Sequence, residues 1–331
     1  AREPSLARGQ LGALLVPREH VIDPWSPFHH YANEARRRGT RFVFDATLES
    51  GAFGSGAWTL RLGNGATVRA GHVVNCAGLH GDTVEHACLG DSHFEIRPRA
   101  GQFVVFDKAA ARHVGAIVLP VPNEITKGVV LTRTAFGNVL VGPTAEEQRD
   151  RERAVTTTEA SRALIAEAAR LVPALADVPV TATYAGLRPG SDDKRYRLRH
   201  EPDRHWLTVG GIRSTGMTAS LGLAEHAAEL LLGEATEAPA DDAPLGRPPV
   251  LSEHERRDWQ TPGYGEIVCH CELVTRREIE AALDAPVPAR SLAGIRRRTR
   301  YGLGRCQGFN CAGRLAELTD GRLVHPVPGA A

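Results

Sequence analysis

Val209-Gly-Gly-Ile-Arg-Ser-Thr-Gly-Met-Thr218 joins an expected strand, Trp206 to Val209, to an expected helix, Thr218 to Leu232. Two adjacent glycines, Gly210 and Gly211, permit a tight turn between these two elements. The start of a helix offers free N–H groups and the positive end of the helix dipole, so this segment can stabilise negative charge. An ordinary turn between a strand and a helix is the alternative interpretation.

A second segment, Val73-Val-Asn-Cys-Ala-Gly78, is an apolar strand that ends in small residues. Small residues at the end of a strand let the backbone approach the phosphates of a dinucleotide closely. Many buried strands end in Ala-Gly, so the pattern is weak alone. It gains weight beside the first segment, because both place a glycine turn directly after an apolar strand.

Four of the six cysteines lie in the last fifth of the chain, while Cys76 and Cys88 stand apart. The spacing is Cys269-x-Cys271 and then Cys306-x4-Cys311. Zinc sites usually use pairs with two to four intervening residues. One intervening residue on one side and four on the other suit a 2Fe–2S cluster, whose two irons each take two thiolates. Structural zinc and unliganded thiols are the alternatives.

The composition indicates an ordinary globular protein. The chain has 331 residues, of which 42% are hydrophobic and 24% charged, and its formal net charge is +1. A balanced charge argues against a nucleic-acid binder, and no apolar run approaches the ~20 residues of a membrane span. The polar first residues do not resemble a secretory signal. Together with the clustered thiols, they predict a location in the reducing cytoplasm.

The first 233 residues alternate helical and strand-like segments. Pro24 to Gly39 is an expected helix, because proline is favoured near a helix start and glycine after its end. Thr156 to Leu171 is a second, amphipathic helix. The expected strands are Arg41–Phe44, Trp58–Leu62, Thr67–Asn75, Phe103–Phe106, Ala116–Leu119, Gly128–Thr132 and Asn138–Val141. This mixture predicts an α+β substrate domain beside part of an α/β nucleotide-binding domain.

A change in composition divides the chain. Residues 234–262 begin with a stretch that has four prolines, several acidic residues and no apolar periodicity, so they are predicted to be a linker. The linker separates a predicted first domain, residues 1–233, from a second domain, residues 263–331.

The C-terminal segments resemble a known family. Ile267-Val-Cys-His-Cys-Glu-Leu-Val-Thr275 and the segment from Arg296 to Cys311 are similar to the ferredoxin-like domain named after bacterioferritin-associated ferredoxin. The resemblance implies a small helical domain whose four cysteines bind a 2Fe–2S cluster.

The earlier segments, with Arg97 to Asp107 and Tyr184 to Gly190, resemble the FAD-dependent D-amino-acid-oxidase-like superfamily, in particular its glycerol-3-phosphate dehydrogenase-like members. The resemblance implies that Ala77 and Gly78 lie along the FAD and that Arg188 holds the carboxylate or phosphate of the substrate. A surface ion pair is the alternative for Arg188, and also for Arg213. The residues implied to face the flavin ring are Gly211, Ile212, Arg213, Thr215, Gly216, Met217 and Thr218.

One family feature is not found in this sequence. Members begin with a strand, a Gly-x-Gly-x-x-Gly turn and a helix that bind the FAD pyrophosphate, and Gly51-Ala-Phe-Gly-Ser-Gly56 has the wrong spacing. We therefore expect a fragment that lacks the first ~140 residues, about one domain. A separate chain that supplies this half is the less favoured alternative.

The resemblance implies a flavin dehydrogenase that oxidises a small anionic hydroxy or amino substrate, such as glycerol 3-phosphate. Electrons would leave FAD through the 2Fe–2S cluster to an acceptor protein or a quinone pool. The alternative is a non-catalytic protein that only transfers electrons, or an inactive fragment. The sequence does not assign a general base; His29 and His30 are candidates by their chemistry alone.

Overall fold

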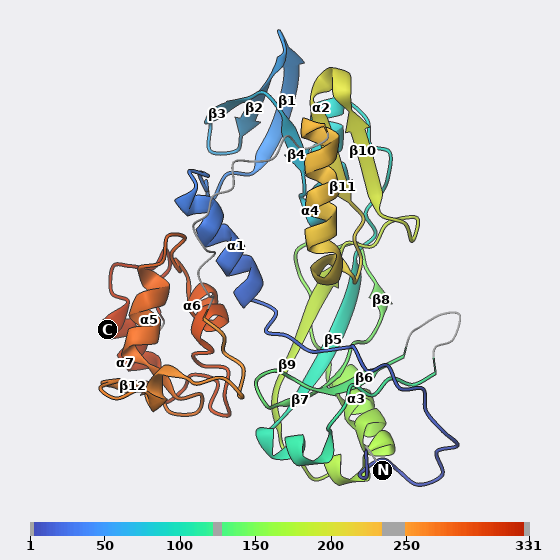
Figure 1. The fold of residues 1–331 in the computed structure, drawn as a ribbon, viewed down its shortest axis with the longest axis vertical. Helices are drawn as coiled ribbons and strands as arrows, with labels where there is room; N and C mark the ends of the chain where they lie inside the picture. The colour runs from blue at the N-terminus through green and yellow to red at the C-terminus, as the bar shows by residue number, and fades with distance from the viewer. Residues whose placement is uncertain (1–2, 122–127, 234–248, 328–331) are drawn as a thin grey trace.

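The computed structural model describes residues 3–121, 128–233 and 249–327. Its longest sheet is formed by β5 (Arg99–Phe106), β6 (Val130–Arg133), β7 (Val139–Gly142), β8 (Glu146–Glu147) and β9 (Val180–Arg188). All neighbouring strands are antiparallel: β5 pairs with β9 along one edge and with β7 and β8 along the other, and β6 pairs with β7. Figure 1 shows β5 and β9 side by side through the middle of the molecule.

Helix α3 (Thr158–Leu171) packs on this sheet. The helix begins where the hydroxyl of Thr157 accepts a hydrogen bond from the Ala160 N–H at 3.2 Å. Its apolar face is buried against strands β5, β6 and β7. The shared core consists of Val104, Phe106, Ala110, Val114, Leu131, Val139, Val141, Leu164, Ala168, Leu171, Val172 and Leu175. This packing fixes the C-terminal half of β5, and the strand extends from there to Arg99.

A second sheet contains β4 (Val73–Asn75), β10 (Arg197–Glu201) and β11 (Trp206–Gly210) in the order β10-β11-β4. β4 runs parallel to β11, whereas β10 is antiparallel to it. A third sheet, β1 (Leu48–Gly54), β2 (Ala57–Leu62) and β3 (Thr67–Ala70), packs beside it. The fully buried rings of Trp58 and Trp206 lie 5.1 Å apart at this junction. Helices α2 (Gly81–Leu89) and α4 (Gly216–Leu232) follow β4 and β11.

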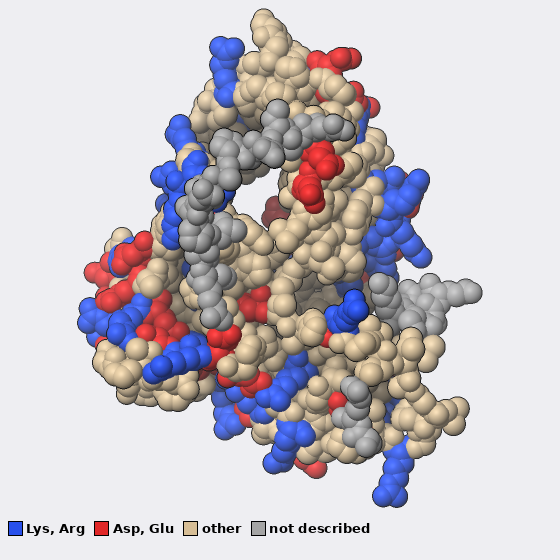
Figure 2. Space-filling view, in the orientation of Figure 1, with Lys and Arg blue, Asp and Glu red and all other residues tan. Residues whose placement is uncertain are grey.

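The C-terminal elements form a small helical unit with its own core. They are β12 (Ile267–Cys269), β13 (Val274–Thr275), α5 (Arg276–Leu283), α6 (Leu292–Thr299) and α7 (Ala312–Leu318). Helix α5 begins with a capping box: the Thr275 hydroxyl accepts from the Glu278 N–H at 3.2 Å, and the Glu278 carboxylate accepts from the Thr275 N–H at 2.9 Å. Figure 2 shows acidic and basic side chains interspersed over this unit.

Most expected elements are found, with three corrections. Helix α1 (Ser26–Arg37) and α3 lie within their expected ranges, and β2, β6, β7 and β11 match within two residues. The expected strand Thr67–Asn75 is wrong as one element, because β3 and β4 belong to different sheets. Arg41–Phe44 forms no strand, and Ala116–Leu119 forms only a bridge from Val118 to Leu131. Within the described residues, no helix has the length and apolar character needed to cross a membrane.

Candidate functional site

The two glycine turns expected from the sequence meet at one edge of the second sheet. Because β4 and β11 are parallel neighbours, their carboxyl ends lie at the same edge, where ligands bind in open α/β sheets. Ala77 and Gly78 follow β4, and Gly211 follows β11. Gly78 and Gly211 have φ angles of +56° and +64°, in the left-handed region that favours glycine. A Cβ atom on Gly211 would also lie 2.7 Å from Cγ of Arg197.

Asn75, at the end of β4, organises the first turn, and the sequence interpretation did not single it out. Its side chain is buried, donates to the Gly81 carbonyl at 2.8 Å and accepts from the Ala77 N–H at 3.2 Å. An asparagine that bonds the backbone two residues ahead forms an Asx turn. The sequence does contain a signal for this turn, namely an asparagine directly before small residues at the end of an expected strand.

The second turn leads directly into α4. Thr215 precedes the helix and its hydroxyl bonds the Tyr196 hydroxyl at 2.5 Å, so it does not cap the helix. The first turn of α4 carries no acidic residue, and its N–H groups have no partner within the helix. These features fit the negatively charged edge of a reduced flavin. Ile212, Arg213, Gly216 and Met217 are half-buried, and Thr218 is exposed.

Arg188 lies at the end of β9, beside this turn. Its Nη2 donates to the Thr144 carbonyl at 2.9 Å, and among the described residues it forms no ion pair. Burial lowers the pKa of its guanidinium, as do the charges of Arg99 and Arg213. The Ser191 hydroxyl, three residues further on, would lie 3.2 Å from a Cβ atom on Gly211. The structure therefore places Arg188 close to the turn implied to face the flavin.

The four clustered cysteines come together as two contacting pairs. The free thiols of Cys271 and Cys306 form a hydrogen bond with one another, and so do those of Cys269 and Cys311. Cys269 and Cys311 are buried in the core, and burial raises the pKa of Cys311 to about 11. No three His, Cys, Asp or Glu side chains of the described residues converge on a single metal-ion position. Two thiol pairs fit a two-iron cluster, whose irons each take two thiolates.

The loop after Cys306 points backbone donors at its sulfur. The N–H groups of Asn310, Gly308 and Phe309 bond this sulfur and lower the pKa of the thiol. Successive N–H groups of this kind form a nest that stabilises an anion. Gly304 packs closely against the partner thiol's residue, because a Cβ atom on Gly304 would lie 2.5 Å from Cβ of Cys271. The donor set and its surroundings thus fit a negatively charged iron–sulfur cluster.

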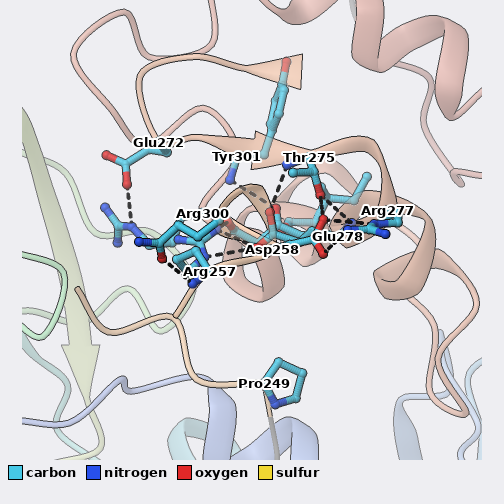
Figure 3. Close-up of polar contacts among 12 residues, drawn as sticks. Pro249, Arg257, Asp258, Glu272, Thr275, Arg277, Glu278, Arg300 and Tyr301 are labelled. Carbon is cyan, nitrogen blue, oxygen red and sulfur yellow. Dashed lines mark hydrogen bonds and ion pairs between the residues drawn. The ribbon is translucent and has the colours of Figure 1, made fainter. Parts of the chain in front are cut away.

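Ion pairs hold the segments that carry these cysteines (Figure 3). Glu272, next to Cys271, accepts from Arg300 Nε at 2.8 Å, and both side chains are nearly inaccessible to solvent. Arg257 donates to Glu278 at 2.7 Å, which ties residues that precede the domain to α5. A buried pair costs desolvation, so it indicates a fixed geometry more than extra stability.

The two histidine candidates, His29 and His30, lie on α1. Helix α1 contacts the C-terminal domain, since the Val287 N–H donates to Asn33 Oδ1 at 2.9 Å. Burial, and then the charge of Arg298, lowers the pKa of His29 to about 4. The general base stays unassigned.

Comparison with known proteins agrees with both halves of this description. Residues 1–230 match the family described as FAD dependent oxidoreductase, and residues 267–320 match the BFD-like [2Fe-2S] binding domain. Glycerol 3-phosphate dehydrogenase of Caloramator mitchellensis is 30% identical over 328 residues, which are 96% of this chain and 67% of that protein. A chain of the anaerobic glycerol-3-phosphate dehydrogenase of Escherichia coli (strain K12) is 26% identical, over 96% of this chain and 65% of its own length.

A solved structure has the same fold. The dithionite-reduced L-alpha-glycerophosphate oxidase from Mycoplasma pneumoniae with FAD bound gives a TM-score of 0.55 at 26% identity, over 62% of this chain and 55% of the other. The chain therefore spans about two thirds or less of the length of these relatives. The predicted resemblance, the mixed α+β and α/β fold and the cofactors FAD and 2Fe–2S are confirmed. The chain belongs to the FAD dependent oxidoreductase family and carries a BFD-like [2Fe-2S] binding domain.

Proposed function

We propose that the protein oxidises a small anionic hydroxy substrate such as glycerol 3-phosphate and passes the electrons from FAD through the 2Fe–2S cluster. The observation that carries the proposal is Arg188, a half-buried arginine beside the Gly211 turn with no ion-pair partner among the described residues. A guanidinium in this setting is suited to binding an oxyanion. The named activities of the two glycerol-3-phosphate dehydrogenases support the same substrate class.

The chain contributes binding and orientation. The residues that would hold FAD are Ala77, Gly78, Gly211, Ile212, Arg213, Thr215, Gly216, Met217 and Thr218. When bound, FAD accepts a hydride and releases electrons singly. Arg188 would bind the anionic end of the substrate. Because Ser191, three residues after Arg188, packs against Gly211, the reacting carbon of the bound substrate would lie near the flavin turn.

The cysteine pairs would hold the cluster through Cys269, Cys271, Cys306 and Cys311. We propose that the electrons then leave to an acceptor protein or to a quinone pool. We also propose that the protein acts in the cytoplasm, where a partner can bring it to the membrane. The proposed division into a flavin domain at 1–233, a linker at 234–262 and an iron–sulfur domain at 263–331 follows from the same assignment, and the short helix Asp258–Gln260 lies within the proposed linker.

The test is the Arg188→Ala variant in a steady-state assay with glycerol 3-phosphate. Loss of a charged hydrogen bond to the substrate should weaken transition-state binding by ~1.5–3 kcal/mol. This change lowers kcat/KM about 10- to 150-fold. Added guanidinium should restore part of the activity. Arg97→Ala is the matched control, because Arg97 is exposed and paired with Glu95 at 2.9 Å. An unchanged kcat/KM in Arg188→Ala would refute the role assigned to Arg188. If the wild-type protein holds the cluster but shows no turnover, it serves electron transfer alone.

A further inference from the structure

One face of the β5–β9 ladder carries three distinct pairs of residues. Arg99 is directly opposite Arg188, Gly101 opposite Gly186, and Phe103 opposite Tyr184. Because alternate residues of a strand point to the same face, the three pairs follow one another along one surface. The Phe103 and Tyr184 rings are stacked, with centroids 4.9 Å apart and an interplanar angle of 14°. The surface thus has a charged end, a bare centre and an aromatic end.

The two glycines at the centre differ in what covers them. A Cβ atom on Gly186 would meet no atom within 4 Å. A Cβ atom on Gly101 would lie 2.6 Å from Nη2 of Arg188. The Arg188 guanidinium therefore extends over Gly101, from the charged end toward the open centre of the face.

Arg99 lies on this surface and forms no ion pair within the described residues. Its Nε is buried and has no hydrogen-bond partner. Glu147 is opposite Arg99 on the β8 side, but its side chain is exposed and no ion pair joins the two. Neighbouring arginines are neutralised: Arg97 pairs with Glu95 at 2.9 Å and Arg197 with Asp192 at 2.8 Å.

Two arginines directly opposite one another on a sheet repel. At Arg188, burial lowers the pKa of the guanidinium, and the positive charges of Arg99 and Arg213 lower it further. An anion with more than one negative charge, placed between the guanidinium groups, would offset this cost. A phosphate monoester near pH 7 carries a charge of about −1.5 to −2 on three acceptor oxygens, whereas a carboxylate carries one charge on two oxygens.

We propose that Arg99 is a second anion-binding residue beside Arg188, and that the pair selects phosphate monoesters over carboxylates. The proposal rests on the proposed function, since it concerns the same substrate site. One guanidinium fork satisfies a carboxylate, and the second arginine gains a partner only when the ligand has a third oxygen and a second charge. Arg99 is thereby a specificity-determining residue.

The test is calorimetric binding of sn-glycerol 3-phosphate and of D-glycerate at pH 7.5 to the purified full-length protein, loaded with FAD and kept reduced with dithionite so that neither ligand is oxidised. Arg99→Gln should weaken binding of glycerol 3-phosphate about tenfold or more, the effect of losing a charged hydrogen bond, and should change glycerate binding by less than about threefold. Arg99→Lys, which keeps a charge but loses the fork, should fall between. Arg97→Gln is the matched control, and the unfolding midpoint of each variant shows that it is folded.

The outcomes separate the two proposals. If Arg188→Gln weakens the binding of both ligands and Arg99→Gln binds both as tightly as the wild type, Arg99 has no role in binding. In that case only the proposal about Arg99 fails. If Arg99→Gln weakens both ligands equally, Arg99 binds anions without selecting among them, and the specificity proposal is overturned. If the wild-type protein binds neither ligand, the substrate assignment itself falls. A selective loss for glycerol 3-phosphate in a folded Arg99→Gln variant supports the proposal.

Discussion

At the scale of single residues, the sulfur atoms of the proposed iron–sulfur site lie in unlike surroundings. Cys306 receives three backbone N–H groups, whereas Cys311 is packed in the core and has a pKa raised by burial to about 11. The first environment stabilises a thiolate without a metal, and the second does not. Bound iron deprotonates both thiols, because a metal takes only thiolate ligands.

We predict that Cys306→Ser removes the visible absorbance of the cluster, because serine replaces a thiolate ligand by a hydroxyl. Cys76→Ser is the control, since Cys76 follows β4 and takes no part in the thiol pairs. Iron, sulfide and zinc analysis after anaerobic purification measures the metal directly. Stoichiometric zinc without iron in the wild-type protein would show that the cluster assignment is wrong.

Single residues also show what the sequence could and could not predict. The cysteines were proposed as ligands from their spacing, because a metal site made of two close pairs leaves a local pattern. Arg188 was proposed as a site residue only through the family resemblance. Arg99 was missed as a site residue, because an arginine has no local signature and its significance depends on a partner brought opposite by strand pairing. Its buried, unpartnered Nε is visible only in three dimensions.

At the scale of elements, the β5–β9 ladder provides two glycines in equivalent positions with different surroundings. We predict that Gly101→Ala destabilises the protein by about 1–3 kcal/mol, the usual cost of overpacking. The new Cβ would lie 2.6 Å from Arg188 Nη2 and 2.9 Å from Cβ of Pro143, so Arg188 must also move. Gly186→Ala meets no atom within 4 Å and should unfold like the wild type. Urea unfolding of both variants is the measurement, and equal midpoints would contradict the packing argument.

The elements that were predicted well are those whose ends are marked by capping residues or by glycine in the sequence. Helix α3 begins at a threonine cap, and α1 is followed by Gly39 with a φ angle of +98°. The segment 41–44 failed because strand propensity reflects packing against a neighbour more than the backbone itself. Phe42, Val43 and Phe44 are between 39% and 57% exposed, and no described strand pairs with them. Sequence alone does not reveal whether a neighbouring strand is in reach.

At the scale of the whole molecule, the C-terminal domain contacts the far end of the long sheet. Arg300 lies over the Phe136 ring, 3.9 Å from its centroid, and Arg305 pairs with Asp107 at 2.8 Å. A pocket of about 250 Å³ at this contact is lined by residues of both parts, among them Asp107, Lys108, Cys271 and Arg305. Cys271, a residue of the predicted cluster site, thus lines the junction between the two domains.

We predict that Phe136→Ala loosens this contact. A cation–π interaction contributes about 0.5–2 kcal/mol, so its loss should increase the population of separated domains about 2- to 30-fold. Phe136→Tyr keeps the aromatic face under Arg300 and should behave like the wild type. Small-angle scattering measures the change as a larger radius of gyration. Identical scattering from the alanine variant and the wild type would show that Phe136 does not hold the domains together.

Strand β5 has a consequence for how the protein tolerates insertions and deletions. Its eight residues span roughly 24 Å, with Arg99 at one end and Asp107, the partner of Arg305, directly after the other. One added residue would turn Arg99, Gly101 and Phe103 to the opposite face, because side chains alternate along a strand. Two added residues would restore the faces but shift Arg99 against Arg188 by about 7 Å. Changes of length are therefore confined to the loops on either side, and β5 can vary only by substitution.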